Sequence, residues 1–244
     1  MSEDGGAPAD RERRTSSSSG VTADARVDRG MRRLLALREH RLAGGARQVG
    51  WKLGFGSPPA RAALSLDEPL VGFLLDGGML PDGATVPLEG WHNPMLEAEI
   101  AVHLGPDASI AGVSAAIELA DLHPMPTDVE EILAGGIYTR HVVLGPVVPG
   151  RETSDGVVAR IVVDGAEVAV TDDVSELVGE LAGNVRSAAA TLAAHGESLG
   201  DGQFLMSGSV FPPLPVRPGQ RVEVSLEPLG RLGLTFAGPG TPPA

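Results

Sequence analysis

The segment Leu96-Glu97-Ala98-Glu99-Ile100-Ala101-Val102-His103 has the alternating pattern of a β-strand. Its even-numbered residues are all apolar and would share one face, whereas Glu97 and Glu99 would point together to the other. Two carboxylates held side by side repel each other unless water screens them or a divalent cation binds between them. The pair therefore indicates either a solvent-facing edge or a metal site. His103 shares this face, either as a further ligand or as an ordinary hydrogen-bonded residue.

A third carboxylate, Glu118, interrupts the run Ala115-Ala116-Ile117-Glu118-Leu119-Ala120, which otherwise has the composition of a buried strand. A buried carboxylate normally has a partner, because an unpaired one is costly. The partner is either an arginine, such as Arg140, or a cation that Glu118 shares with the first two glutamates. Three carboxylates without a Cys/His cluster would suit a hard cation, Mg²⁺ or Mn²⁺.

Lys52 is the only lysine among the 19 basic residues of the chain; all the others are arginines. Such a lysine either persists by chance or marks a site where arginine cannot serve. A desolvated ammonium group can lose its proton, whereas a guanidinium group effectively cannot. The surrounding stretch Val49-Gly50-Trp51-Lys52-Leu53-Gly54 is apolar and strand-like. A buried lysine without a purpose is rare, so these neighbours favour a functional role.

Outward from these segments, the sequence alternates short apolar runs with turn residues. Helices are expected over 22–43, 128–134 and 173–195. Strands are expected near 47–54, 71–75, 84–89, 94–104, 115–121, 138–147, 157–163, 166–170, 203–208, 220–227 and 231–236, with Asp164-Gly165 as a hairpin turn. Turns join these strands more often than helices do. The pattern favours an α+β fold with a mixed β-roll or sandwich over a doubly wound parallel sheet.

Composition excludes several classes of function. The chain of 244 residues has no cysteine, so disulfides, thiolate metal sites and cysteine nucleophiles are excluded. Its formal net charge of −13 argues against binding to nucleic acid or to an anionic membrane. No apolar run approaches the length of a transmembrane helix, and the polar N-terminus lacks a signal core. We expect a cytoplasmic protein with a disordered leader (1–21), a single catalytic domain (22–236) and a flexible tail (237–244).

Five motifs in this order resemble the fumarylacetoacetate hydrolase superfamily, and in particular its 2-keto-4-pentenoate hydratase and 4-oxalocrotonate decarboxylase branch. They are Gly50-Trp51-Lys52-Leu53-Gly54 with Ser57-Pro58, Leu96-Glu97-Ala98-Glu99-Ile100, Ile117-Glu118-Leu119-Ala120-Asp121, Met206-Ser207-Gly208-Ser209, and Pro215-Val216-Arg217-Pro218-Gly219. The Glu-x-Glu pair alone is a weak signal. The ordered set with a lysine ahead of it is specific, and it covers about residues 25–236.

The resemblance implies strands rolled around a central site, with the N-terminal helix and the long second helix packed outside. It implies that Glu97, Glu99 and Glu118 bind Mg²⁺ or Mn²⁺, and that Lys52 lies beside the substrate oxygens as the catalytic residue. Gly208 and Ser209 would hold the carboxylate end of the substrate, and Ser57 would line the same pocket. Such members are expected to form homo-oligomers.

Two departures from the family pattern bear on the reaction. The segment between Glu99 and Glu118 is shorter than in the family, so a connecting helix is expected to be missing. Gly135-Gly136 stands where hydratases typically carry an Asp-Asn pair and a serine, and the nearby Arg140 could supply another polar contact to the substrate.

The expected activity is that of a hydro-lyase or carboxy-lyase acting on a small 2-oxo or 2-hydroxy-dienoic acid through a metal-stabilised enolate. Two alternatives remain open at this point. One is an acylpyruvate-type C–C hydrolase, which would use the same enolate. The other is a catalytically silent family member that serves as a binding subunit.

Overall fold

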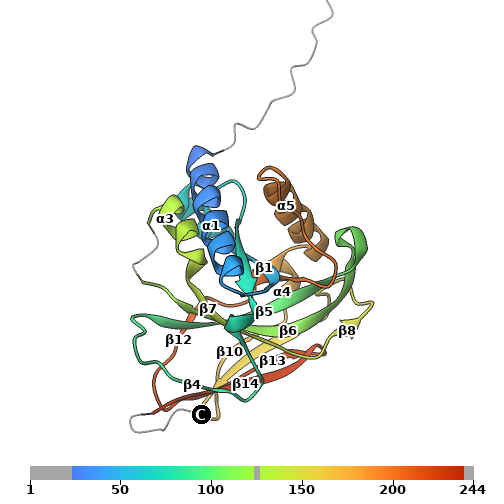
Figure 1. Cartoon of the computed structure of the whole chain (residues 1–244). Helices are drawn as coiled ribbons and strands as arrows, with labels where there is room; N and C mark the ends of the chain where they lie inside the picture. The colour runs from blue at the N-terminus through green and yellow to red at the C-terminus, as the bar shows by residue number, and fades with distance from the viewer. Residues whose placement is uncertain (1–23, 124–126, 239–244) are drawn as a thin grey trace, which may run out of the picture.

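The computed structural model describes residues 24–123 and 127–238. The leader predicted over 1–21 and most of the tail predicted over 237–244 lie outside the described residues. Figure 1 shows strongly curved sheets with α1, α3 and α5 gathered on one side of them. The described chain forms one nine-stranded and one five-stranded sheet, which confirms the predicted α+β fold with mixed β-structure.

The nine-stranded sheet is mixed, because β1 runs parallel to β11 whereas β2, β5 and β6 pair with their neighbours in antiparallel fashion. Its strands in spatial order are β2 (Leu70–Leu75), β1 (Gln48–Gly54), β11 (Phe204–Ser209), β5 (Pro94–Leu104), β6 (Ile110–Asp121), β7 (Thr139–Leu144) and β3 (Met79–Leu80), with β12 (Leu214–Pro215) beside β5 and β8 (Val148–Pro149) beside β6. All the longer strands of this sheet were predicted. The two-residue strands carried no separate signal.

The five-stranded sheet contains the predicted Asp-Gly hairpin. Its order is β10 (Ala166–Thr171), β9 (Val158–Val163), β13 (Arg221–Glu227), β14 (Gly230–Phe236) and β4 (Thr85–Val86). Asp164 and Gly165 have φ angles of 51° and 84°, as a tight turn between twisted strands requires. The strand predicted over 84–89 is only two residues long, since Pro87 has no N–H to donate to a ladder.

The helices are α1 (Ala25–Ala43), α2 (Pro58–Leu64), α3 (Val129–Ala134), α4 (Val174–Val178) and α5 (Leu181–Ala193), with 3₁₀ turns η1 (Asp76–Gly78), η2 (Pro106–Ala108) and η3 (Gly136–Tyr138). The prediction of one long helix over 173–195 is wrong. Gly179 adopts φ 72° and ψ −168°, which ends α4 and lets α5 start in a new direction. The short α2 was not predicted. No helix among the described residues is long and apolar enough to cross a bilayer.

The longest hairpin of the molecule joins β5 to β6 through η2 alone. No α-helix lies between Glu99 and Glu118, as the short connection predicted. The pairing register nevertheless places Glu118 directly opposite Glu97. The shortening therefore leaves these two carboxylates on the same face of neighbouring strands, within the reach of a cross-strand pair.

Candidate active site

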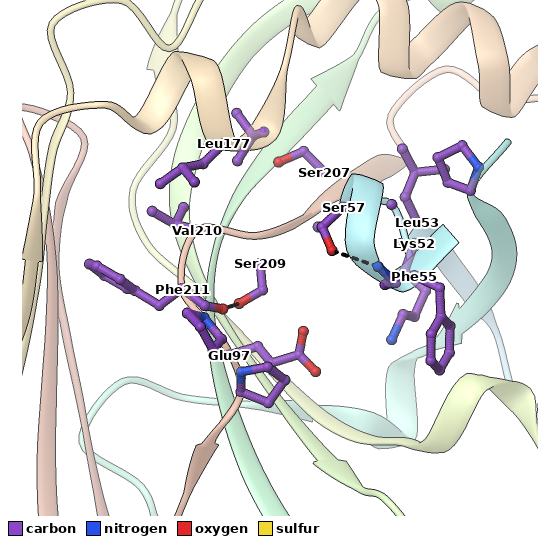
Figure 2. A pocket seen from close by; sticks show the side chains of 18 of the residues that line it. Lys52, Leu53, Phe55, Ser57, Glu97, Leu177, Ser207, Ser209, Val210 and Phe211 are labelled. Carbon is purple, nitrogen blue, oxygen red and sulfur yellow. Dashed lines mark hydrogen bonds between the residues drawn. The ribbon is translucent and has the colours of Figure 1, made fainter. Parts of the chain in front are cut away.

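A cavity of about 720 Å³ opens beside the ends of β1, β5 and β11. Figure 2 shows its polar end, where Lys52 and Glu97 lie near Ser57 and Ser209. Five of the predicted site residues line it, namely Lys52, Ser57, Glu97, Gly208 and Ser209. Glu99 and Glu118 are almost fully buried, with exposed fractions of 1% and 0%. They are not among the lining residues.

The deepest feature of this site is a buried ion pair between Lys52 on β1 and Glu118 on β6. The Lys52 ammonium group donates a hydrogen bond to Glu118 Oε1, and the side chains are 4% and 0% exposed. Two strands, β11 and β5, separate β1 from β6 in the sheet order. In a flat sheet the two backbones would be roughly 14 Å apart, given about 4.8 Å between neighbouring strands. The contact is possible because the sheet curls and both side chains point inside the curve.

Glu97 and Glu99 lie on this same inner face, since they alternate with the buried apolar residues of β5. Burial raises the pKa of Glu97 to about 7, and the negative charge of Glu118 contributes to this rise while Lys52 opposes it. Burial also raises the pKa of Glu99 well above its usual range, with further contributions from Glu118 and Glu97. The backbone N–H of Gly208 donates to Glu99 Oε2 at 2.9 Å and partly offsets this. Glu97 and Glu99 therefore keep their protons to higher pH than free glutamates do, because the charge of Lys52 alone does not offset burial and the neighbouring carboxylates.

The chemistry of these groups fits a divalent cation. All the candidate donors are carboxylate oxygens, which hard cations such as Mg²⁺ and Mn²⁺ prefer. Glu118 Oε2 is buried and has no hydrogen-bond partner in the described part of the chain. However, no group of three acidic or histidine side chains within residues 24–123 and 127–238 is already arranged closely enough to form a metal shell. Lys52, which binds Glu118, supplies part of the positive charge that a bound cation would supply.

Lys52 is held in its protonated form. Burial alone would lower the pKa of its ammonium group, but the nearby charges of Glu118, Glu97 and Glu99 raise it overall. Its second contact is the backbone carbonyl of Ile137, 3.4 Å from Nζ. This arrangement makes Lys52 a source of positive charge and of a proton rather than a base.

The remaining predicted site residues differ in how they are placed. Ser57 caps α2, where its hydroxyl accepts a hydrogen bond from the Ala60 N–H at 3.4 Å. The Ser209 hydroxyl donates to the Phe211 carbonyl at 2.6 Å. Gly208 has a φ of 97°, a conformation that favours glycine, and it orients Glu99 through its N–H.

Arg140 is not brought to the cavity with the other predicted residues. Its guanidinium group binds Asp121 at 3.0 Å and lies over the ring of Trp91. It also does not pair with Glu118, which was the alternative to a metal for that carboxylate. A register shift in the pairing of β6 with β7 leaves Arg140 without a partner on β6. Thr139, rather than Arg140, therefore shares the inner face with Val142, which lies opposite Glu118. His103 does not line the cavity either. Its ring nitrogen Nε2 lies 2.9 Å from the Ser114 hydroxyl.

Two contacts at Glu118 and Lys52 were missed in the sequence. The Thr139 hydroxyl donates to Glu118 Oε1 at 2.9 Å, and Ile137 supplies the carbonyl that accepts from Lys52. Both follow the Gly135-Gly136 pair. Gly136, Ile137 and Tyr138 have φ angles of 70°, 53° and 64°, so the chain takes an unusual path here. The two glycines were a visible signal of this turn, but nothing near them in the sequence indicated that it contacts Lys52 and Glu118.

Comparison with known proteins finds relatives named as decarboxylases and hydratases of small organic acids. No family model matches the chain. It is 27% identical to a 4-oxalocrotonate decarboxylase of Pseudomonas putida over 211 residues, covering 79% of this chain and 78% of the relative. It is 28% identical to a 2-hydroxyhexa-2,4-dienoate hydratase of Comamonas testosteroni over 220 residues, covering 83% and 82%.

Solved structures give the same result. The 4-oxalocrotonate decarboxylase from Pseudomonas putida G7, complexed with magnesium and adipate, matches with a TM-score of 0.75 at 25% identity and covers 83% of each chain. A fumarylpyruvate hydrolase from Pseudomonas aeruginosa, in complex with Mn²⁺ and pyruvate, shares the fold with a TM-score of 0.63 at 14% identity, covering 79% of this chain and 90% of that one. The chain is thus a homologue of the 4-oxalocrotonate decarboxylases and 2-keto-4-pentenoate hydratases, with structural neighbours in the fumarylacetoacetate hydrolase superfamily, as its motifs indicated.

Proposed function

We propose that this protein is a divalent-metal-dependent lyase of the hydratase or decarboxylase type, acting on a small 2-oxo or 2-hydroxy-dienoic acid. One observation carries the proposal: Lys52 and Glu97 line the polar end of a cavity of about 720 Å³, and the buried Glu118, which pairs with Lys52, and Glu99 lie behind them on the same inner face. The relatives named above act, by their names, on acids of this kind.

Glu97, Glu99 and Glu118 would hold the cation, for which Mg²⁺ and Mn²⁺ are our candidates. Two observations support this assignment: the pKa values of Glu97 and Glu99 are raised, and Glu118 Oε2 has no hydrogen-bond partner among the described residues. A cation would stabilise the ionised form of the first two carboxyl groups and would give the Glu118 oxygen a partner. When bound, the cation supplies Lewis acidity beside the carboxylate and keto oxygens of the acid, where negative charge develops.

The residues of the chain provide the rest of the chemistry. Lys52 places a proton and a positive charge at Nζ, next to the same oxygens, in a site from which water is largely excluded. Three groups hold this ammonium group in position. Glu118 and the Ile137 carbonyl accept hydrogen bonds from it, and the Thr139 hydroxyl donates to Glu118. Ser57, Gly208 and Ser209 form the wall against which the carboxylate end of the substrate would rest.

The test is a turnover assay on purified protein with 2-hydroxypenta-2,4-dienoate, 2-hydroxyhexa-2,4-dienoate, 4-oxalocrotonate and an acylpyruvate. We expect turnover of at least one dienoate or oxalocrotonate with Mg²⁺ or Mn²⁺, and its loss after chelation. Glu97→Gln should lose this activity, whereas Glu152→Gln, on an exposed loop outside the cavity, should keep it. Turnover of the acylpyruvate alone, or turnover that chelation leaves unchanged, would contradict the proposal.

We further propose a homo-oligomer, at least a dimer, as the resemblance implies. Light scattering at micromolar concentration would test it, and a monomer would contradict it. Cytoplasmic localisation stays a prediction from the sequence.

A further inference from the structure

Away from Lys52 and Glu97, the wall of the cavity is mostly apolar. Figure 2 shows Leu177, Val210 and Phe211 together on the side of the cavity opposite Lys52. The same lining includes Phe55, Pro69 and Val178. A substrate that rests its carboxylate at the polar end would therefore extend its other end along hydrocarbon.

The charged groups of the lining are distributed unevenly. Among the described residues that line the cavity, Lys52 is the sole basic one, and it already binds Glu118. The acidic ones are Glu97, at the polar end, and Glu176 on α4, beside Leu177. The far end thus presents a negative charge and no positive one.

Neutral polar groups do not replace the missing cation. Asn184 lines the cavity, but its side-chain amide donates to the Val178 carbonyl at 2.9 Å. Ser207 has a buried hydroxyl without a partner among the described residues, and a single hydroxyl is a weak site for an ionised group. Leu177 is 48% exposed and Glu176 is exposed as well, so a carboxylate placed here would keep part of its hydration. It would nevertheless find no cation to pair with, and Glu176 would repel it.

We infer that the cavity selects acids with one carboxylate and an uncharged, apolar tail, and discriminates against dicarboxylates such as 4-oxalocrotonate. This inference rests on the proposed function, since it assumes that the first carboxylate binds at the Lys52 end. Glu176 and Leu177 are the specificity-determining residues. Both residues lie on α4, which ends before Gly179, while α5 begins at Leu181.

The test compares two ligands of equal carbon chain, 2-oxohexanoate and 2-oxoadipate, which differ in whether the far end is a methyl group or a carboxylate. Binding of each is measured by calorimetry in the presence of Mn²⁺. We expect wild-type protein to bind 2-oxohexanoate at least about tenfold more tightly, because the far carboxylate of 2-oxoadipate lies on apolar surface beside Glu176 and has no cationic partner. Glu176→Arg should tighten 2-oxoadipate by about tenfold or more relative to 2-oxohexanoate. Leu177→Arg provides a second variant with the same expected direction.

Glu152→Arg is the matched control, since it changes the net charge equally on an exposed loop outside the lining. If it shifts 2-oxoadipate as much as Glu176→Arg does, the effect is long-range charge and the inference is wrong. Equal or tighter binding of 2-oxoadipate by wild type also overturns it.

Turnover measurements distinguish a failure of this inference from a failure of the proposed function. A protein that converts the oxalocrotonate faster than the dienoates keeps the proposed function and loses the inference. If the protein binds 2-oxohexanoate more tightly but converts none of these acids, the inference about selectivity is supported and the assignment as a lyase is wrong.

Discussion

Lys52 and Glu118 contact each other across three strand-to-strand steps of one sheet, from β1 over β11 and β5 to β6. This contact couples the curvature of the sheet to the chemistry of the site. A buried pair of this kind is weak support for stability as a whole, but either partner alone is an uncompensated buried charge. Losing one of the two charges should therefore destabilise the fold more than losing both, unless a cation replaces Lys52.

The first prediction concerns this coupling. Lys52→Met should destabilise the metal-free protein by about 3–5 kcal/mol, because it leaves the Glu118 carboxylate buried without its cation. The double variant Lys52→Met/Glu118→Gln should recover most of the loss, since no charge is then left unpaired. Urea unfolding in the presence of a chelator measures both. Equal stability of wild type and Lys52→Met would show that the pair does not form in solution.

A second prediction is a pH dependence of metal-free stability. The folded-state pKa of Glu97 is about 7, above its ordinary value of 4.5, so the folded protein holds a proton that the unfolded chain releases between these values. The corresponding stability is present below about 4.5 and is lost as the pH rises through about 7. His103 and His141, whose pKa values burial lowers, act in the opposite sense.

The variant Glu97→Gln isolates the contribution of the glutamate, since both proteins contain the same histidines. Relative to this variant, wild type should lose stability between pH 5 and pH 8, as measured by the melting temperature with a chelator present. Mg²⁺ or Mn²⁺ should reverse the loss and should bind more tightly as the pH rises, because binding displaces protons from the carboxyl groups. A constant difference between wild type and variant across this range would rule out a raised pKa at Glu97.

The third prediction tests the metal ligands one at a time. Glu97→Ala and Glu99→Ala should each abolish the increase in melting temperature that Mg²⁺ or Mn²⁺ gives to wild type. Without metal, each variant should melt at the same temperature as wild type or higher, because removing one crowded carboxylate relieves repulsion. Glu152→Ala is the control and should respond to metal as wild type does. A full metal response in either ligand variant would mean that the ligand assignment is wrong.

Much of the fold was predictable because the longer strands of the larger sheet are short apolar runs or, in β5, alternate clearly between apolar and polar residues. In β5 the apolar residues Leu96, Ala98 and Ile100 are all fully buried, and the glutamates between them share the other face as expected. Turn chemistry at Asp164-Gly165 was equally local. Such features depend on residues within a few positions of each other, so a sequence displays them directly.

The errors have a different origin, since they concern contacts between distant segments. The choice of Lys52 rather than Arg140 as partner of Glu118 depends on how far the sheet curls, which no local pattern reports. Thr139 reaches Glu118 only through the register of β7 on β6. Gly179 was visible within the predicted helix over 173–195, but glycine inside a helical pattern is often tolerated.

The last prediction concerns the identity of the lone lysine. Lys52→Arg should keep the charge and the pairing with Glu118, yet lose about a hundredfold or more in turnover, roughly 3 kcal/mol of transition-state stabilisation. The space around the side chain is limited: a Cβ on Gly72 would lie only 3.3 Å from Lys52 Cγ and 3.0 Å from Ile137 Cδ1. A planar, larger guanidinium group would displace the substrate, and it places its charge and its N–H donors differently from a compact ammonium group.

Metal affinity should change little in Lys52→Arg, because the positive charge beside the glutamates is preserved. Turnover and metal affinity are therefore measured together for wild type, Lys52→Arg and Lys52→Met. The reverse exchange Arg47→Lys, at a side chain that is 83% exposed, is the control and should leave both quantities unchanged. If Lys52→Arg retains turnover near that of wild type, Lys52 acts as a charge alone. The absence of every other lysine from the chain would then carry no mechanistic meaning.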